Sequence, residues 1–419
     1  MDKINRKAIV LLLLGFLFLV PQLSLSAQNA WQGDNLTLKI AVIGPGDELY
    51  FWWGHIGLVA EDRVTGHARF YDWGAFSFDN ENFFLNFAFG RLLYSCMVSL
   101  ADDNYDVYIH RNRDITLYTL NLPANKKDEV LRFAEINMLP ENCDYAYHHF
   151  KDNCATRIRD ILDIALDGQF SAEYEEMPGR FTLRQHVRRH TWFNPFFDWI
   201  LNFWMGQDID RPITVWDDMF LPSEIAMRME EFRYPNGQLL VSNVEIINKS
   251  EDRPVVLNAP RMQWPGALLV SLLFSELLLL LYLLVLRRNW FKKFLGITTG
   301  LLGLFFGIAG SMLFFMTFFT DHDYTYHNIN ILFVNPLLLA AIPLGLIFGF
   351  SESEKKRFVA ARLLRALWAY VILGSLFTMV IKFFPAFYQQ NQVTQALLMP
   401  IAITMVLIMT RLGQITNKR

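Results

Sequence analysis

Two residues of the chain have the types and the settings that thiol chemistry needs. His55 lies in the apolar, strand-like stretch 52–58, and Cys154 follows Asp152 and Asn153 at what reads as the start of a helix. Cysteine attacks acyl carbonyls as the thiolate, and a helix N-terminus and a nearby imidazole are two common ways to lower the pKa of a thiol. We therefore expect Cys154 to act as a nucleophile with His55 as its base.

A predicted pair of strands joined by a turn supplies a third candidate. If Ala60 faces His67 across this hairpin, Asp72 lies directly opposite His55, and opposed side chains share one face within contact distance. We expect Asp72 to orient the imidazole, with Tyr71 or His67 taking its place if the register slips.

The remaining pattern before residue 170 predicts a mixed α+β domain. A helix is expected over 126–139, and another from residue 155, where apolar residues recur at helical spacing. Asp152 or Asn153 is a good N-cap, which places Cys154 in or beside the electropositive first turn. Strands are expected at 36–43, 68–73, 92–100, 105–110 and 115–120.

The first residues have the composition of a secretory signal. Basic residues precede an unbroken apolar run over 8–20, and small residues follow at 24–27. We expect residues 1–26 to be a signal peptide cleaved near Ser26 or Ala27. An uncleaved first anchor is the alternative, and it leaves the downstream chain on the same side of the membrane.

The 419-residue chain is too apolar for a purely soluble enzyme, with 53% hydrophobic residues and a mean hydropathy of +0.21. The excess lies toward the C-terminus. We expect a catalytic domain over 27–262 and a membrane domain over 263–419. The stretches long enough to span a bilayer are 265–286, 294–319, 331–350, 366–384 and 394–410.

The positive charges between these spans predict the orientation of the membrane domain. Lysines and arginines gather between the first and second spans, between the third and fourth, and after the fifth, whereas loops 320–330 and 385–393 have none. The positive-inside rule places the catalytic domain outside the cytoplasm and the C-terminus inside. The net charge of −3 gives no reason to expect a nucleic-acid partner.

Three cysteines lie in the exported region, where an oxidising compartment lets pairs form. If Cys96 pairs with Cys143, Cys154 remains the free thiol that a nucleophile requires. Pairing of Cys143 with Cys154 would contradict the proposed chemistry.

Other polar and aromatic residues are weaker candidates. The aromatic segment 192–205 is read either as a lipid-facing lip of the site or as an aromatic core helix. Arg157 and Arg159 are candidates for binding a phosphate headgroup, with structural ion pairs as the alternative. Asp321, His322 and His327 are too few to favour a metal site, so we expect their loop to dock on the catalytic domain or to contact substrate.

The order of a strand histidine followed by a helix cysteine resembles the permuted branch of the papain-like NlpC/P60 superfamily, which includes lecithin:retinol acyltransferase-like enzymes. Several motifs are closer to the N-terminal periplasmic domain of Lnb-type lipoprotein N-acyltransferases. Trp73 stands where that family suggests tyrosine, and His67 does not look like a family feature. The motifs are Trp53-Gly54-His55, Tyr71-Asp72-Trp73-Gly74, the segment 152–160 and Phe220-Leu221-Pro222.

The resemblance continues into the membrane domain and so covers nearly the whole chain. Segments 320–322, 328–332 and 335–337 look like the polar exported loop of the same family. This likeness makes Asp321, His322 and Asn330 candidates for substrate binding.

The resemblance implies a bacterial inner-membrane acyltransferase that needs no cofactor or metal. Cys154 would take a fatty acyl chain from a membrane phospholipid as a thioester and pass it to the N-terminal amine of a diacylglyceryl-cysteine lipoprotein. Asn153 or nearby backbone amides would hold the oxyanion. The alternatives are a membrane-anchored papain-like cell-wall hydrolase and a non-enzymatic membrane sensor in which Cys154 is structural.

Overall fold

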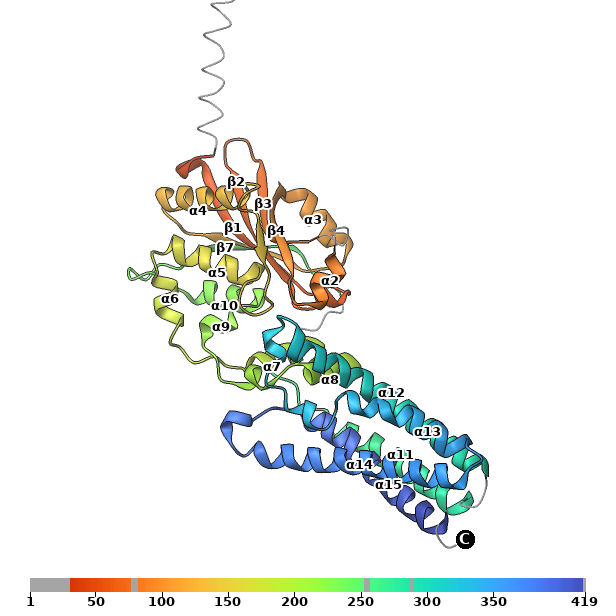
Figure 1. Ribbon diagram of the computed structural model, residues 1–419. Helices are drawn as coiled ribbons and strands as arrows, with labels where there is room; N and C mark the ends of the chain where they lie inside the picture. Colours follow the sequence, from red (N-terminus) through yellow and green to blue (C-terminus); the bar gives the residue numbers. More distant parts are fainter. Residues whose placement is uncertain (1–30, 77–81, 252–256, 286–288, 417–419) are drawn as a thin grey trace, which may run out of the picture. The chain divides into compact units, whose positions relative to one another are not determined.

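The structure is a computed structural model that describes residues 31–76, 82–251, 257–285 and 289–416 (Figure 1). The expected signal peptide lies outside the described residues. The chain divides into two compact units, and two short segments of the exported region belong to the second unit. The first unit holds residues up to Phe83, Leu92–Arg180 and Ile213–Val255, and the second holds Phe84–Arg91, Phe181–Pro212 and Val256–Arg419.

The first unit is built on an antiparallel sheet in which the described strands have the order β6-β4-β3-β2-β1-β5-β7. In β1, Leu36, Leu38 and Ile40 pack into one hydrophobic cluster while Ala41 and Ile43 pack into another, so both faces of the sheet are covered. The strands are β1 (Leu36–Ile43), β2 (His55–Asp62), β3 (Ala68–Ala75), β4 (Leu93–Leu100), β5 (Ile115–Leu120), β6 (Asp144–Ala146) and β7 (Val241–Asn248).

Helices cover the two faces of this sheet. Helices α4, α5 and α10 contribute to the larger cluster, and α3 covers the opposite face (Figure 1). In α5 the apolar residues at helical spacing are all buried, as the sequence predicted. The helices of this unit are α3 (Ala101–His110), α4 (Ala124–Asn137), α5 (Cys154–Ala165), α6 (Gln169–Tyr174), α9 (Val215–Asp218) and α10 (Pro222–Glu231).

The strand predicted at 105–110 is wrong, because these residues belong to helix α3. The short alternation of polar and apolar residues there resembles a strand, but Ala101, Tyr105 and Tyr108 also recur at helical spacing. All three pack into the cluster on the α3 face. The negative charges of Asp102 and Asp103 in the first turn stabilise α3, because they interact favourably with the positive N-terminal end of the helix dipole.

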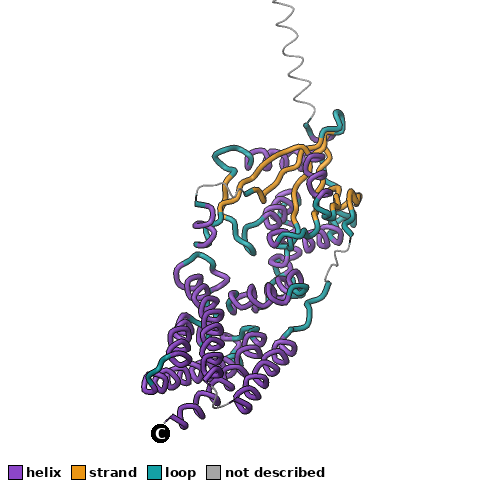
Figure 2. The backbone as a smooth tube through the Cα atoms, turned by 90° about the vertical axis from the view of Figure 1, so that its right-hand side faces the viewer, coloured by secondary structure: helices purple, strands orange, loops and turns teal. Residues whose placement is uncertain are grey.

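The described residues of the second unit form helices and loops, and the strands in Figure 2 belong to the first unit. Five segments of this unit are long and apolar enough to cross a membrane, which confirms the predicted number of spans. The main elements are α7 (Leu183–Thr191), α8 (Pro195–Trp204), α11 (Trp264–Val285), α12 (Asn289–Phe319), η5 (Ile329–Leu332), η6 (Pro336–Ala340), α13 (Ala341–Phe350), α14 (Glu354–Ile381) and α15 (Gln392–Thr416).

The third span is not one continuous α-helix. Two short 3₁₀ segments, η5 and η6, precede α13, and Asn335 caps the second of them through its side chain. Glycines of α12 allow this irregular segment to approach closely. A Cβ on Gly303 would lie 2.4 Å from Cβ of Ala341, and a Cβ on Gly310 would lie 2.6 Å from the Asn335 backbone.

Helix α14 begins at Glu354, well before the predicted start of the fourth span at residue 366. Ser353 caps it, and the helix continues through the basic residues of the connecting segment. The hydropathy pattern marks only the apolar part of a helix, so it places the start of α14 too late.

Candidate active site

His55 is the first residue of β2, and its side chain meets Asp72 of β3. The imidazole Nε2 lies 3.0 Å from Asp72 Oδ1, and the two side chains are only 12% and 13% exposed. The predicted register was wrong by two residues, because Ala60 faces Arg69 and Asp72 faces Gly57. A shift of two keeps every side chain on the same face, so Asp72 reaches His55 diagonally.

Gly74 gives the imidazole its space. A Cβ on Gly74 would lie 2.6 Å from Cε1 of His55 and 3.2 Å from its Nδ1. The Gly74 amide also donates a 2.6 Å hydrogen bond to Asp72 Oδ1, the oxygen that contacts His55. This glycine, which the sequence analysis named only as part of a family motif and gave no role, therefore leaves room for the ring and fixes the carboxylate.

The charge state of His55 is set by its neighbours. Burial works to lower the pKa of His55, but the Asp72 carboxylate, with smaller contributions from Tyr108 and Cys154, raises it well above the usual value. The imidazolium is therefore favoured near neutral pH. An imidazolium is the form that stabilises a neighbouring thiolate and that can give a proton to a leaving group.

Cys154 is the first residue of α5, as its position after a capping residue predicted. Asn153 is the N-cap, and its side chain accepts hydrogen bonds from the amides of Ala155 and Thr156. The Asn153 Nδ2 group donates to the carbonyls of His149 and Phe220. Both amide hydrogens of Asn153 thus hold the start of α5, and its side-chain oxygen occupies the Ala155 and Thr156 amides, so the Cys154 amide is the remaining candidate donor to an oxyanion in this turn.

All three cysteines are free. Cys96 and Cys143 are neighbours across β4 and β6, since the Cys96 amide donates a 2.8 Å hydrogen bond to the Cys143 carbonyl. Burial raises the pKa of Cys96 to about 12, so this thiol is unsuited to nucleophilic attack. The pairing of Cys143 with Cys154 that would block the chemistry is not formed.

The two arginines of α5 form the structural ion pairs that were the alternative to headgroup binding. Arg157 binds both carboxylate oxygens of Asp152, at 2.6 and 2.8 Å, and lies 4.4 Å over the Tyr145 ring. Arg159 pairs with Asp160 at 2.8 Å. In this arrangement Arg157 stabilises the turn that presents Cys154.

The two substitutes for Asp72 lie elsewhere. Tyr71 is buried in the larger hydrophobic cluster, because neighbouring residues of a strand point to opposite faces. His67 is exposed just before β3 begins. A tyrosine missed by sequence reasoning does lie near His55: the Tyr108 ring of α3 has its centroid 6.3 Å from the imidazole. The helical spacing of Tyr108 was the signal that would have found it.

The candidates in the loop after α12 make contacts within the second unit. Asp321 pairs with Arg91 at 2.8 Å. His322 is buried, and its Nε2 lies 3.1 Å from the Phe87 carbonyl while its Nδ1 lies 2.9 Å from the Tyr324 hydroxyl. Burial lowers the pKa of His322, so the neutral ring donates to the carbonyl and accepts from the hydroxyl. These two residues hold the segment 84–91.

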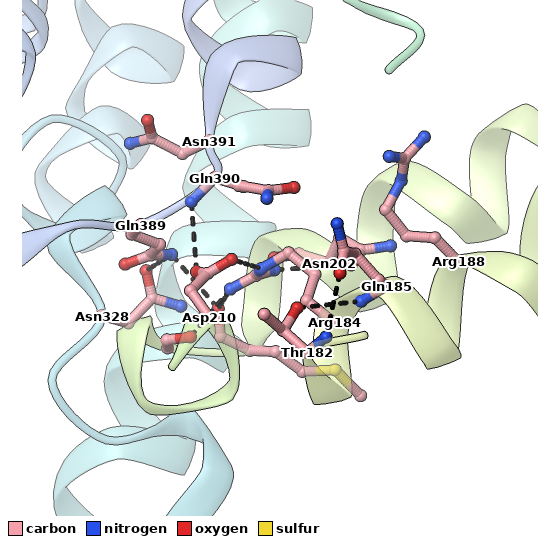
Figure 3. A network of polar contacts seen from close by, with 12 residues as sticks. Thr182, Arg184, Gln185, Arg188, Asn202, Asp210, Asn328, Gln389, Gln390 and Asn391 are labelled. Carbon is pink, nitrogen blue, oxygen red and sulfur yellow. Dashed lines mark hydrogen bonds and ion pairs between the residues drawn. The ribbon is translucent and has the colours of Figure 1, made fainter. Parts of the chain in front are cut away.

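Asn330 belongs to a buried polar network in the second unit, part of which Figure 3 shows. Its amide donates to the Phe203 carbonyl and accepts a 2.9 Å hydrogen bond from Asn391. Arg184 and Asp210 form a fully buried ion pair nearby, and the amide of Gln390 donates to the same carboxylate. Within the described residues, no group of three or more histidine, cysteine or acidic side chains is arranged to hold a metal.

Two tryptophans of α8 pack inside the second unit. This agrees with the reading of segment 192–205 as an aromatic core helix, which was the alternative to a lipid-facing lip. Trp199 donates a 3.0 Å hydrogen bond to Thr394 of α15 and stacks on Phe305 of α12. Trp204 donates to the Ala309 carbonyl. Three aromatic residues of segment 192–205 are exposed, Trp192 at 38%, Phe193 at 54% and Phe196 at 53%.

These features define a membrane-anchored protein with a mixed α+β domain that carries a buried His–Asp pair and a thiol at a helix start. Residues 25–189 match the family model described as the Lnb N-terminal periplasmic domain, and residues 267–418 match the Lnb transmembrane domain. The chain belongs to the Lnb family, and it is a multi-pass inner-membrane protein with a periplasmic domain. No curated protein and no solved structure matches it.

Proposed function

We propose that the protein is a lipoprotein N-acyltransferase that moves a fatty acyl chain from a membrane phospholipid to the N-terminal amine of a diacylated lipoprotein. The observation that carries the proposal is the arrangement of His55, Asp72 and the start of α5 in the periplasmic domain of an Lnb-type membrane protein. Family membership supports an enzyme, and the residue types at the site suit a thiol mechanism.

In the first half-reaction, the Cys154 thiolate attacks the carbonyl carbon of a phospholipid ester. A C–S bond forms, and the tetrahedral intermediate then breaks its C–O bond to leave a thioester on Cys154. The His55 imidazolium gives its proton to the departing lysophospholipid oxygen. The Cys154 amide would donate to the developing oxyanion, because the Ala155 and Thr156 amides already donate to the Asn153 side chain.

In the second half-reaction, the free amine of the diacylglyceryl-cysteine attacks the thioester carbonyl. An N–C bond forms, the C–S bond breaks, and neutral His55 takes the proton that the amine loses. The enzyme returns to the thiolate–imidazolium state, and the product is a triacylated lipoprotein. Asp72 keeps Nε2 engaged throughout, so the other ring nitrogen, Nδ1, exchanges protons with the reacting groups.

The membrane spans suit such a reaction. Moving an acyl chain from the bilayer into water costs roughly 0.8 kcal/mol per methylene. An enzyme anchored by five membrane-spanning segments stays with the membrane in which donor and acceptor both reside. A hydrolase acting on the cell wall has no such requirement.

The test is the intact mass of a reporter lipoprotein from a host that lacks its own N-acylation. We expect an added acyl mass with the wild-type chain, none with Cys154→Ser or His55→Ala at matched abundance, and the wild-type result with the control Cys143→Ser. No added mass with a folded wild-type chain would reject the proposal. Release of peptidoglycan fragments in that case would indicate a wall hydrolase.

A further inference from the structure

Helix α11 carries a carboxyl group near the middle of a membrane span. Glu276 is the only acidic residue in the five apolar stretches of the membrane domain, and it lies well inside the span Trp264–Leu284. Its side chain is exposed, and within the described part of the chain it has no hydrogen-bond or ion-pair partner. A carboxyl group that faces hydrocarbon is costly, and ionisable residues of spans normally face a bundle interior. Glu276 therefore indicates a partner outside this copy of the chain.

The two sides of α11 have opposite surroundings. One side packs on α15, and its residues are buried: Ser271, Ser275, Leu278 and Tyr282. The other side carries Glu276 among leucines that are 50% to 72% exposed: Leu269, Leu273, Leu280 and Leu283. We call Glu276 and these four leucines the outer seam.

The spacing of the outer seam is that of a helix–helix interface. Its members are separated by four, three, four and three residues, which is the heptad spacing along which one helix packs on another. At about 3.6 residues per turn this spacing keeps them on one face for about four turns. Helix α11 is also the least buried of the five candidate spans, so the described part of the second unit leaves the outer seam uncovered.

A second copy of the chain supplies the partner that the outer seam lacks. All copies enter the membrane in one orientation, so two outer seams can meet in parallel around a two-fold axis along the bilayer normal. Each residue then faces its own copy at the same depth, leucine against leucine and Glu276 against Glu276. No cation of a second copy lies at this depth, because the only basic residue in the five apolar stretches is Lys382, which lies at the exported end of α14 and donates to Asn391 and Gln395.

We propose that the chain forms a homodimer through the outer seam of α11, in which the two Glu276 carboxyl groups hydrogen-bond to each other. A carboxyl group that keeps its proton donates through its O–H group and accepts through its other oxygen, so two of them satisfy each other in hydrocarbon. The leucines of the outer seam pack above and below this pair. The interface lies within the second unit and does not depend on the chemistry of Cys154.

The experiment counts chains per particle, by stepwise photobleaching of the dye-labelled full chain in phospholipid vesicles at a series of protein-to-lipid ratios. We expect wild type to pass from one bleaching step to two as its density rises, and Glu276→Leu to weaken the dimer about tenfold. Glu276→Gln, which can still donate and accept, should keep the wild-type affinity. The control Leu373→Ala, at a 66% exposed leucine of α14, should keep it as well.

Wild type that stays monomeric at every density, or a Glu276→Leu dimer as strong as that of wild type, would overturn the proposal. Neither readout uses acyl transfer, so the dimer and the proposed function can fail separately.

Cross-linking in native membranes tests the geometry and the identity of the partner. Single cysteines are placed in a full-length chain whose own cysteines are replaced by serine, and a copper oxidant then joins neighbouring thiols. We expect a product of twice the chain mass with Leu273→Cys and Leu280→Cys. Val270→Cys, which is 61% exposed but lies off the outer seam, should give none. A cross-link to a different protein in place of this product would overturn the assignment to a second copy.

Discussion

The imidazole of His55 rests against the bare Cα of Gly74: a Cβ on that glycine would lie 2.6 Å from the ring. The atoms that a larger residue would displace belong to the imidazole ring of His55. The substitution would therefore move the ring out of its position. We predict that Gly74→Ala folds but lowers thioester formation at least about tenfold, because misplacing a reacting group by an ångström is costly. Gly266→Ala, where a Cβ meets nothing within 4 Å, is the control.

Removal of the Asp72 charge should change the pH dependence of the reaction. The pKa of His55 is raised chiefly by Asp72 against the effect of burial, and the imidazolium is the form that pairs with the thiolate. Activity that needs this form is present below the pKa of His55 in the folded protein and is lost as pH rises through it.

Asp72→Asn therefore moves the upper limb of the pH–activity profile to lower pH and reduces kcat about a hundredfold. The profile of thioester formation between neutral and alkaline pH measures both effects. A profile that keeps the wild-type upper limb would show that Asp72 does not set the charge of His55. The control Asp160→Asn, at the half-exposed carboxylate that pairs with Arg159 in α5, should keep the wild-type profile.

The buried ion pair in the second unit should carry part of the stability. Arg184 and Asp210 are at most 1% exposed and 2.8 Å apart, and Arg184 also donates to the Met205 and Gly206 carbonyls. Asp210→Asn leaves a buried guanidinium without its charge partner, which typically costs about 3–5 kcal/mol. The control Asp208→Asn, in more exposed pairs with Arg211 and His327, should cost less than about 1 kcal/mol. Thermal unfolding in one detergent compares the two, and equal midpoints would contradict the prediction.

Acid should weaken the exported part of the second unit through His190. Burial lowers the pKa of His190 from 6.5 to about 4, and Arg189 adds to the effect. Between these values the unfolded chain binds a proton that the folded chain does not, so stability is lost as pH falls from about 6.5 to about 4. The contribution is about 3 kcal/mol. His190→Gln removes this component, so its unfolding midpoint should fall less with acid than that of wild type; parallel curves would refute the assignment.

Local patterns predicted much of the fold. Strands β1 and β5 and helix α5 follow from alternation, helical spacing and a capping asparagine, each within a few residues. The sequence predicted the face of the sheet on which Asp72 lies, but not the register of β2 against β3. An error of two residues in the register leaves each side chain on the same face. The pairing of Arg184 with Asp210 was not predictable, because the pair forms only after distant segments have packed.

The candidate site, like the fold, was predicted from the sequence only in part. His55, Asp72 and Cys154 were found from residue type and local setting. The role of Gly74 was missed, because what matters there is the absence of a side chain next to the His55 ring. The roles of Asp321, His322 and Asn330 as holders of other segments depend on carbonyl partners that no sequence pattern reveals.

Two exported segments, Phe84–Arg91 and Phe181–Pro212, belong to the unit that is otherwise formed by the membrane spans. A ribosome makes both of them before any residue of the five spans exists. They must therefore be translocated first and wait for helices that are synthesised later, so the second unit is completed only after the membrane spans have been made. A gene cut at the predicted domain boundary would consequently yield two incomplete halves, and co-expressing those halves is the arrangement under which the second unit could still assemble.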